Sequence, residues 1–372
     1  MPASFAPRVL LLLLSFASIA VAQEMQIPAS AETCGDCHRA IHQGWKRSAH
    51  SQAMENRLFQ DALKLAETEL GSGARRTCLS CHSPVGSEIG DVALQRKVSW
   101  EGVTCEYCHS IRSVTFEDGK PKAHVQISRV KSGPSKDSVS PAHGVEFSAV
   151  HTSSMVCISC HEYKNAQSFS VITTYTEWKD SKYAKDEKNC QSCHMYAVLG
   201  NVVDPRVKRS PAEINLHEMP GSRSTDQLNK AISASLRAQR NAGKVEVAVR
   251  LTNAGAGHSV PTGSPMRRMI LEVCAIVYGG KEQCQQKSYA RTVAGRDGKP
   301  LKFEHVAFIR ASQALSDTRL AAGETRNEAF QFPVAPNARV RVEANLYYYY
   351  SPMASSEAEQ KKKFLSMNQW VQ

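Results

Sequence analysis

Hydrophobic and polar positions follow two different repeats along the chain. Residues 55–70 predict a helix that ends before Gly71. The apolar face of this helix is expected to hold Leu58, Ala62, Leu65 and Ala66. From about residue 225, apolar and polar positions alternate instead, which is typical of half-buried strands.

The alternating part predicts a β-domain. Residues 231–240 and 244–252 form a predicted hairpin around the turn Asn241-Ala-Gly243. Further strands are predicted at 269–278, 301–309, 327–334 and 339–350. Six or more strands with turn signals favour an immunoglobulin-like β-sandwich. We expect residues 351–372, which include Lys361-Lys-Lys363, to form a solvated tail.

Two cysteines of this domain, Cys274 and Cys284, flank Gly279-Gly280 almost symmetrically. This spacing favours a cross-strand disulfide in an oxidising compartment, and two separate buried thiols are the alternative.

Length and composition suggest two folded domains. The chain has 372 residues, of which 42% are hydrophobic and 22% charged, and these values exclude a disordered chain and an ordinary membrane protein. The formal net charge of +11 would by itself suggest an anionic partner such as nucleic acid.

The first 22 residues predict export. Arg8 precedes an apolar run over residues 9–20, and Ala20-Val21-Ala22 provides small residues for cleavage. The alternative is an uncleaved membrane anchor, but the run is short for a membrane span. We therefore expect a periplasmic protein, which could also reach the cell surface, with at most peripheral membrane association.

Ten of the 12 cysteines fall in five C-x-x-C-H motifs, the attachment signature of a c-type haem. Two thiols bind one porphyrin covalently, and the imidazole that follows reaches its iron. A zinc or redox site could explain one copy, but not five. The motifs begin at Cys34, Cys78, Cys105, Cys157 and Cys190, their second cysteines are Cys37, Cys81, Cys108, Cys160 and Cys193, and their histidines are His38, His82, His109, His161 and His194.

The predicted cofactors are therefore five covalently attached haems. Their propionates would roughly cancel the +10 charge that remains after removal of Arg8 with the signal. Because no aromatic and basic motif is present, we expect no nucleic-acid partner.

Eight further histidines supply candidates for the second axial ligands. This abundance favours bis-histidine ligation at most sites, which keeps the reduction potential low. His42 follows His38 by four residues on one helix face and cannot easily reach the far side of that iron. His305 lies in a predicted strand, and we interpret both residues as structural.

The region of residues 30–225 resembles the cytochrome c-554/c-552 family, whose tetrahaem member accepts electrons from hydroxylamine oxidoreductase in ammonia oxidisers. The matching stretches are Trp45-Lys-Arg-Ser48-Ala-His50, Gly102-Val-Thr-Cys105-Glu-Tyr-Cys108-His109, Pro141-Ala-His143 through His151, and Cys190-Gln-Ser-Cys193-His194-Met195 with His217-Glu-Met-Pro220-Gly221. By this resemblance the distal ligands are His50, His143, His151 and His217, with His124 in reserve. The fifth motif and the long C-terminal part depart from the family.

Gly257-His258-Ser-Val-Pro261-Thr-Gly263 is similar to an element of β-domains that are appended to multihaem cytochromes. The resemblance implies that His258 is the distal ligand of a haem in the neighbouring domain, where the glycines would let the backbone approach a flat porphyrin. A structural loop histidine is the alternative.

The sequence thus predicts a two-domain α+β protein. It comprises a signal peptide (1–22), a helical and loop-rich multihaem domain with a haem-packed core (23–222), a β-sandwich (223–350) and the tail (351–372). Its predicted function is electron transfer with redox partner proteins, namely other cytochromes or a membrane quinol-linked donor. A reductase of nitrogen or sulfur oxyanions at one five-coordinate haem is the alternative, although no catalytic constellation is evident. The β-domain could also serve in docking.

Overall fold

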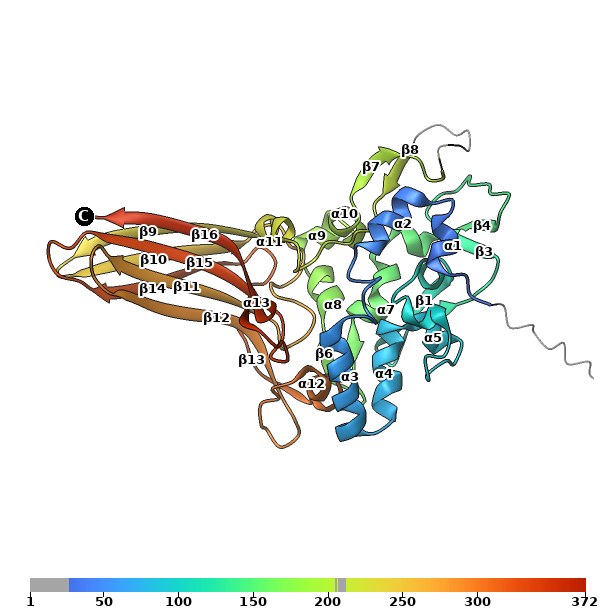
Figure 1. Ribbon diagram of the computed structural model, residues 1–372, viewed down its shortest axis with the longest axis horizontal. Coiled ribbons are helices and arrows are strands. Elements are labelled where there is room, and N and C mark those ends of the chain that lie inside the picture. The colour runs from blue at the N-terminus through green and yellow to red at the C-terminus, as the bar shows by residue number, and fades with distance from the viewer. Residues whose placement is uncertain (1–26, 205, 207–211) are drawn as a thin grey trace, which may run out of the picture.

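The computed structural model describes residues 27–204, 206 and 212–372. The predicted export signal lies outside these residues. The molecule has two parts: one of short helices and small strand pairs, and an elongated one of long strands that ends at the C-terminus (Figure 1). Among the helices described, none combines the length and the apolar character that crossing a membrane requires.

The first part contains ten α-helices and three 3-10 helices between residues 31 and 194. The α-helices are α1 (Ala31–Gly35), α2 (Arg39–Lys46), α3 (Arg57–Leu70), α4 (Gly73–His82), α5 (Pro84–Glu88), α6 (Cys105–Cys108), α7 (Ile158–His161), α8 (Thr174–Lys179), α9 (Lys182–Lys185) and α10 (Cys190–His194). The 3-10 helices are η1 (Lys97–Trp100), η2 (Ala149–Thr152) and η3 (Ser154–Cys157).

Four two-stranded sheets connect these helices. The pairs are β1 (Ile111–Glu117) with β2 (Lys120–Val125), β3 (Val130–Gly133) with β4 (Gly144–Phe147), β5 (Tyr163–Lys164) with β6 (Ser170–Ile172), and β7 (Ala197–Gly200) with β8 (Ala212–Asn215). The β3–β4 pair is parallel and the other three pairs are antiparallel.

The predicted helix at residues 55–70 is confirmed as α3. Its first turn is capped by the Asn56 side chain, which accepts a hydrogen bond from the Phe59 N–H, and Gly71 with φ 86° ends it. The buried face differs from the predicted one, because Leu63 and Ala66 are buried whereas Leu65 is exposed. The helix packs against α4, and this contact selects the face that carries Leu63.

The second part begins with α11 (Thr225–Ala231) and consists of two antiparallel sheets. The three-stranded sheet has the order β14 (Thr325–Pro333), β10 (Lys244–Asn253), β9 (Ile232–Asn241). The five-stranded sheet has the order β13 (Gln313–Asp317), β12 (Glu282–Ala294), β11 (Arg268–Val277), β15 (Val340–Tyr349), β16 (Lys361–Val371). Helices α12 (Glu304–Arg310) and α13 (Glu357–Gln360) interrupt the strands.

One hydrophobic core is shared by both sheets. Val247 and Leu251 from the three-stranded sheet pack in the same buried cluster as Leu271 and Leu346 from the five-stranded sheet. The predicted hairpin is confirmed as β9–β10, whose register pairs Asn241 with Lys244. Its two turn residues, Ala242 and Gly243, both have positive φ, as a tight two-residue hairpin turn requires.

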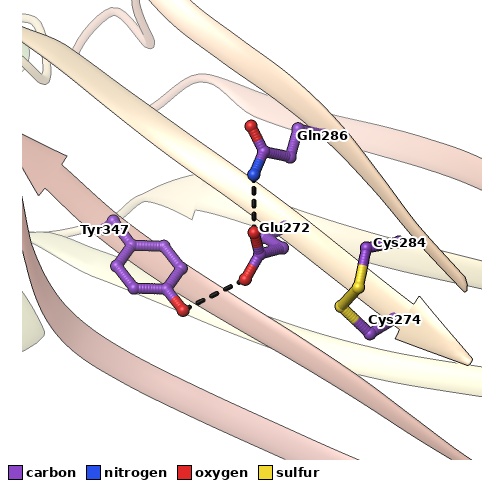
Figure 2. Close-up of a disulfide and its surroundings, with 5 residues drawn as sticks. All are labelled: Glu272, Cys274, Cys284, Gln286 and Tyr347. Atoms are coloured by element: carbon purple, nitrogen blue, oxygen red, sulfur yellow. Dashed lines mark hydrogen bonds between the residues drawn. A yellow bond between two sulfur atoms is a disulfide. The ribbon is translucent and has the colours of Figure 1, made fainter. Parts of the chain in front are cut away.

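Cys274 and Cys284 are joined by a disulfide in the structure, at directly paired positions of β11 and β12. Figure 2 shows the bond beside Glu272, which accepts hydrogen bonds from the Tyr347 hydroxyl (3.1 Å) and the Gln286 amide (2.5 Å). The disulfide therefore ties together the two strands that the sequence pattern places around Gly279-Gly280.

Two predicted elements are wrong. Most of residues 301–309, expected to form a strand, belong to helix α12 (Glu304–Arg310), because Ala307 and the C-cap residue Ala311 lie four residues apart on a face that packs against Val171 and Met266. His305 is accordingly a buried helix residue, and its Nε2 lies 3.1 Å from a Glu69 carboxylate oxygen.

The predicted solvated tail is also wrong. Residues 361–371 form β16, which is antiparallel to β15. The paired register begins with Val340 opposite Val371 and ends with Tyr349 opposite Lys361. Phe364 and Val371 enter the shared core, so the three lysines form the first residues of a structural strand. The three lysines favour a solvated tail, but the apolar residues Phe364 and Val371 make this segment pack as a strand.

Candidate haem-binding sites

Four of the five C-x-x-C-H motifs lie on short helical segments, and the first begins at the end of α1 and continues into the turn before α2. We number them in chain order: site 1 (Cys34–His38), site 2 (Cys78–His82), site 3 (Cys105–His109), site 4 (Cys157–His161) and site 5 (Cys190–His194). One or two helical turns place both thiols and the imidazole of a motif in one neighbourhood. All ten cysteines are free thiols with at least partial exposure. They are thus available for thioether bonds.

Four motif histidines are oriented by a backbone carbonyl. The Nδ1–H groups donate to carbonyl oxygens in His38–Val202 (2.6 Å), His82–Ala53 (3.4 Å), His109–Ser132 (2.7 Å) and His194–Pro220 (2.7 Å). Such a bond fixes the tautomer and leaves Nε2 as the ligand atom, which is the arrangement typical of metal-bound histidine. This observation fits haem at these positions.

Three motif histidines each face one predicted distal histidine. The ring centroids are 6.2 Å apart in His38–His143, 6.1 Å in His50–His161 and 6.3 Å in His194–His258. Metal–imidazole bonds are about 2 Å long. Because a ring centroid lies about a further 1 Å beyond its nitrogen, two imidazoles on one metal have centroids about 6 Å apart. The three separations therefore match two histidines on one iron.

Site 3 has two candidate partners. His217 lies 6.3 Å from His109, and its Nδ1–H donates to the Asn215 carbonyl (2.7 Å), which leaves Nε2 free. His151 lies closer, at 5.5 Å, and its Nε2–H donates to the Cys108 carbonyl (2.9 Å). Its Nδ1 is buried without a hydrogen-bond partner and is the atom that it could offer to a metal.

Site 2 differs from the others. Within the described residues, no second imidazole faces His82 at a comparable separation. Its ring instead stacks on Phe59 of α3, with centroids 3.8 Å apart and planes at 7°. The histidines outside the pairs do not supply a partner: His124 lies on β2 beside Thr115, His42 packs on Trp45, and His305 binds Glu69. The reserve ligand His124 thus faces no motif.

Burial keeps the candidate ligands neutral. Desolvation lowers the pKa of His50, His82 and His109 to about 4, and that of His161 to about 3. A neutral imidazole has the lone pair that a metal requires. These rings are consequently ready to bind iron at neutral pH without losing a proton.

The known proteins that this chain resembles are cytochromes. Residues 33–110 match the family model described as cytochrome c554 and c-prime. Cytochrome c-554 from Nitrosomonas europaea is 25% identical over 162 residues, which are 40% of this chain and 66% of that protein. The crystal structure of a penta-haem cytochrome c552 from Thermochromatium tepidum superposes with a TM-score of 0.73 at 21% identity, and the match covers 93% of this chain and all of that one.

The chain is a multihaem c-type cytochrome. Sequence reasoning found the motifs of this cytochrome and all five histidines that face them in the structure. It could not assign the partners, because the paired residues are separated by about 60 to 110 positions in the chain. Only the fold brings them together.

Thiols from different motifs of this cytochrome are close neighbours. Cys105 lowers the pKa of Cys34, Cys160 lowers that of Cys81, and Cys157 lowers that of Cys190. These contacts join site 1 to site 3, site 2 to site 4, and site 4 to site 5. The hydrogen bonds with Cys190 and Cys81 and burial raise the pKa of the site 4 thiols Cys157 and Cys160, and the nearby Cys108 of site 3 contributes in the same direction. Site 4 therefore neighbours sites 2, 3 and 5.

The loop that carries His258 comes from the β-domain and docks on the first part of the cytochrome. Asn253 is fully buried, and its side-chain amide donates to the His258 carbonyl (2.8 Å). A Cβ on Gly257 would lie only 3.0 Å from the Trp178 ring. The glycine thus permits the loop to approach α8 and α9 closely. The expectation from the sequence was that the glycines let the backbone approach a porphyrin instead.

Proposed function

We propose that this cytochrome binds five covalent haems and transfers electrons among them and to redox partner proteins. The main support for this proposal is the set of facing imidazole pairs, whose ring centroids are 6.1–6.3 Å apart. Two strong-field imidazoles saturate the iron and suit it to electron transfer rather than to substrate binding. Each site has two free thiols and a histidine, which supports one haem per motif.

The proposed axial pairs are His38 with His143, His109 with His217, His161 with His50, and His194 with His258. We prefer His217 to His151 at site 3 because its separation equals that of the other pairs. Site 2 then has a haem whose sixth position holds no histidine. We expect this haem to be high-spin in the oxidised protein.

The proposed electron path follows the neighbouring thiols. It runs from site 1 through site 3 to site 4, which branches to site 2 and site 5. Donors and acceptors of the proposed class, other cytochromes or a membrane quinol-linked protein, would dock at the ends of this path. Nucleic acid is not a proposed partner.

Export to the periplasm is part of the proposal. The signal-like residues 1–22, the haem-attachment motifs and the Cys274–Cys284 disulfide all suit an oxidising compartment. For the β-domain we propose the immunoglobulin-like sandwich class, which is supported by two antiparallel sheets that share one core. We propose a docking role for it as well.

The test is a stoichiometric reductive titration of the purified holoprotein, combined with its intact mass. The proposal predicts five covalently bound haems and an uptake of five electrons per chain. A mass increment of four haems or fewer would contradict the cofactor count. Five haems with an uptake of fewer than five electrons would contradict a continuous electron path.

A further inference from the structure

A largely desolvated carboxylate from the haem domain holds the loop that follows His258. Glu177 lies on α8, and its side chain is 12% exposed. One carboxylate oxygen accepts hydrogen bonds from the Ser259 N–H (3.1 Å) and the Thr262 hydroxyl (2.8 Å). The other accepts from Arg319 (2.7 Å) and the Thr173 hydroxyl (2.7 Å). Both oxygens are thus fully engaged.

Arg319 holds the same loop from the side of the β-domain. Its guanidinium is 9% exposed, pairs with both Glu177 and Asp317, and lies 3.4 Å from the Pro261 carbonyl. The next residue, Leu320, exchanges backbone hydrogen bonds with Val260 at 2.9 and 3.1 Å. The ion pair of Glu177 and Arg319 therefore bridges the two domains on either side of the loop.

Ser259 connects this bridge to the imidazole. Its N–H is held by Glu177, and its carbonyl accepts the His258 Nδ1–H at 2.9 Å. A displacement of Ser259 would move the ring both through the chain and through this hydrogen bond. The orientation of His258 consequently depends on a residue of the other domain.

We infer that Glu177 is a positioning residue that places His258 on the site 5 iron. This inference rests on the proposed ligation of site 5 by His258. Glu177 itself does not face the iron; it fixes the backbone on which the ligand is mounted, and Arg319 balances its charge. Opening the contact between the domains would therefore release the sixth ligand of one haem.

The experiment is electron paramagnetic resonance of the oxidised holoprotein, with the signals expressed as haem equivalents. We expect Glu177→Ala to reduce the low-spin signal from four equivalents to three and to raise the high-spin signal from one to two. Added imidazole should return the site 5 haem to the low-spin state, and the unsubstituted protein with the same imidazole gives the reference for any binding at the open site 2 haem. His258→Ala should give the same spectrum, and the double variant should lose nothing further. Should Glu177→Ala fail to fold, Glu177→Gln, which removes the charge but keeps the shape, must show a high-spin fraction at a second haem.

Glu324→Ala is the matched control. Glu324 is a half-buried carboxylate that binds Arg326 and the Ala321 N–H, close in the chain to Arg319, and no hydrogen bond joins it to residues 258–262. It should keep four low-spin equivalents. A folded Glu177 variant that also keeps four would overturn the inference. If His258→Ala keeps four, the proposed ligation itself fails, so the two failures are distinguishable.

Discussion

Glu106 shows how one charged residue is tied to a haem site. It lies inside the third motif, its side chain is 1% exposed, and both of its oxygens accept hydrogen bonds from Lys131 (2.6 and 2.8 Å). Lys131 precedes Ser132, whose carbonyl orients His109. The ion pair therefore stabilises the fold and the position of the site 3 ligand together.

We expect Glu106→Ala to lower the free energy of unfolding by about 3–5 kcal/mol, because it leaves the Lys131 ammonium without its buried partner. Chemical denaturation of the holoprotein measures this loss. The control is Glu117→Ala, which breaks an exposed pair with Lys122 and should cost about 0–1 kcal/mol. Equal losses in the two variants would refute the role given to burial.

Two single-residue variants can show whether His217 or His151 is the second ligand at site 3. His217→Ala should remove one low-spin haem equivalent, since its Nε2 is the proposed ligand atom. His151→Ala should keep all four equivalents, because its ring packs beside His109 and binds the Cys108 carbonyl. Paramagnetic resonance of both variants decides, and the reverse pattern would assign the ligand to His151 through Nδ1.

At the scale of elements, β16 is a core strand. Phe364 is 4% exposed within the cluster shared by both sheets. Phe364→Ala should therefore lower the free energy of unfolding by about 3–5 kcal/mol through lost burial and a cavity. Lys362→Ala, on the same strand but exposed, should change it by less than about 0.5 kcal/mol. Thermal or chemical unfolding of both variants tests whether this strand carries the stability of the sheet.

Some elements follow from local sequence and others do not. The hairpin β9–β10 follows from strict alternation around a turn, and α3 from helical spacing with an Asn cap and a terminal glycine. Helix α12 and strand β16 are decided by distant partners, namely Val171 and Met266 for α12 and strand β15 for β16. Local secondary-structure propensity does not include those distant tertiary contacts.

The candidate site divides in the same way. Covalent attachment needs residues that are close in the chain, so the motif residues can be read from the sequence. Distal ligation needs residues on opposite faces of one iron, so that pairing emerges from the fold. The absence of a histidine opposite His82, among the described residues, likewise becomes visible only when the other rings are placed.

For the whole molecule, charge is divided unevenly between the two parts. Residues 223–372 contain 22 basic and 12 acidic side chains, whereas residues 23–222 contain 23 of each. Five haems would add roughly ten propionate carboxylates to the neutral part, partly offset by ferric irons. The holoprotein would then join a basic β-domain to an acidic haem domain.

This division predicts an isoelectric point below the value of 9.1 calculated from the sequence. Isoelectric focusing of the oxidised holoprotein measures it, with the polypeptide stripped of haem under denaturing conditions as the control. The stripped chain should focus near the sequence value. A holoprotein that also focuses near 9 would show that the propionates do not offset the basic side chains.

The central claim is that the irons of all proposed haems except the one at site 2 have two histidine ligands. Low-temperature paramagnetic resonance of the oxidised mature protein, calibrated against total haem, tests this claim most directly. The account predicts low-spin signals worth four haems and a high-spin signal worth one. Low-spin signals worth all five haems would show a strong second ligand at site 2. Three or fewer low-spin haems would show that the facing pairs do not bind iron, and would contradict the account.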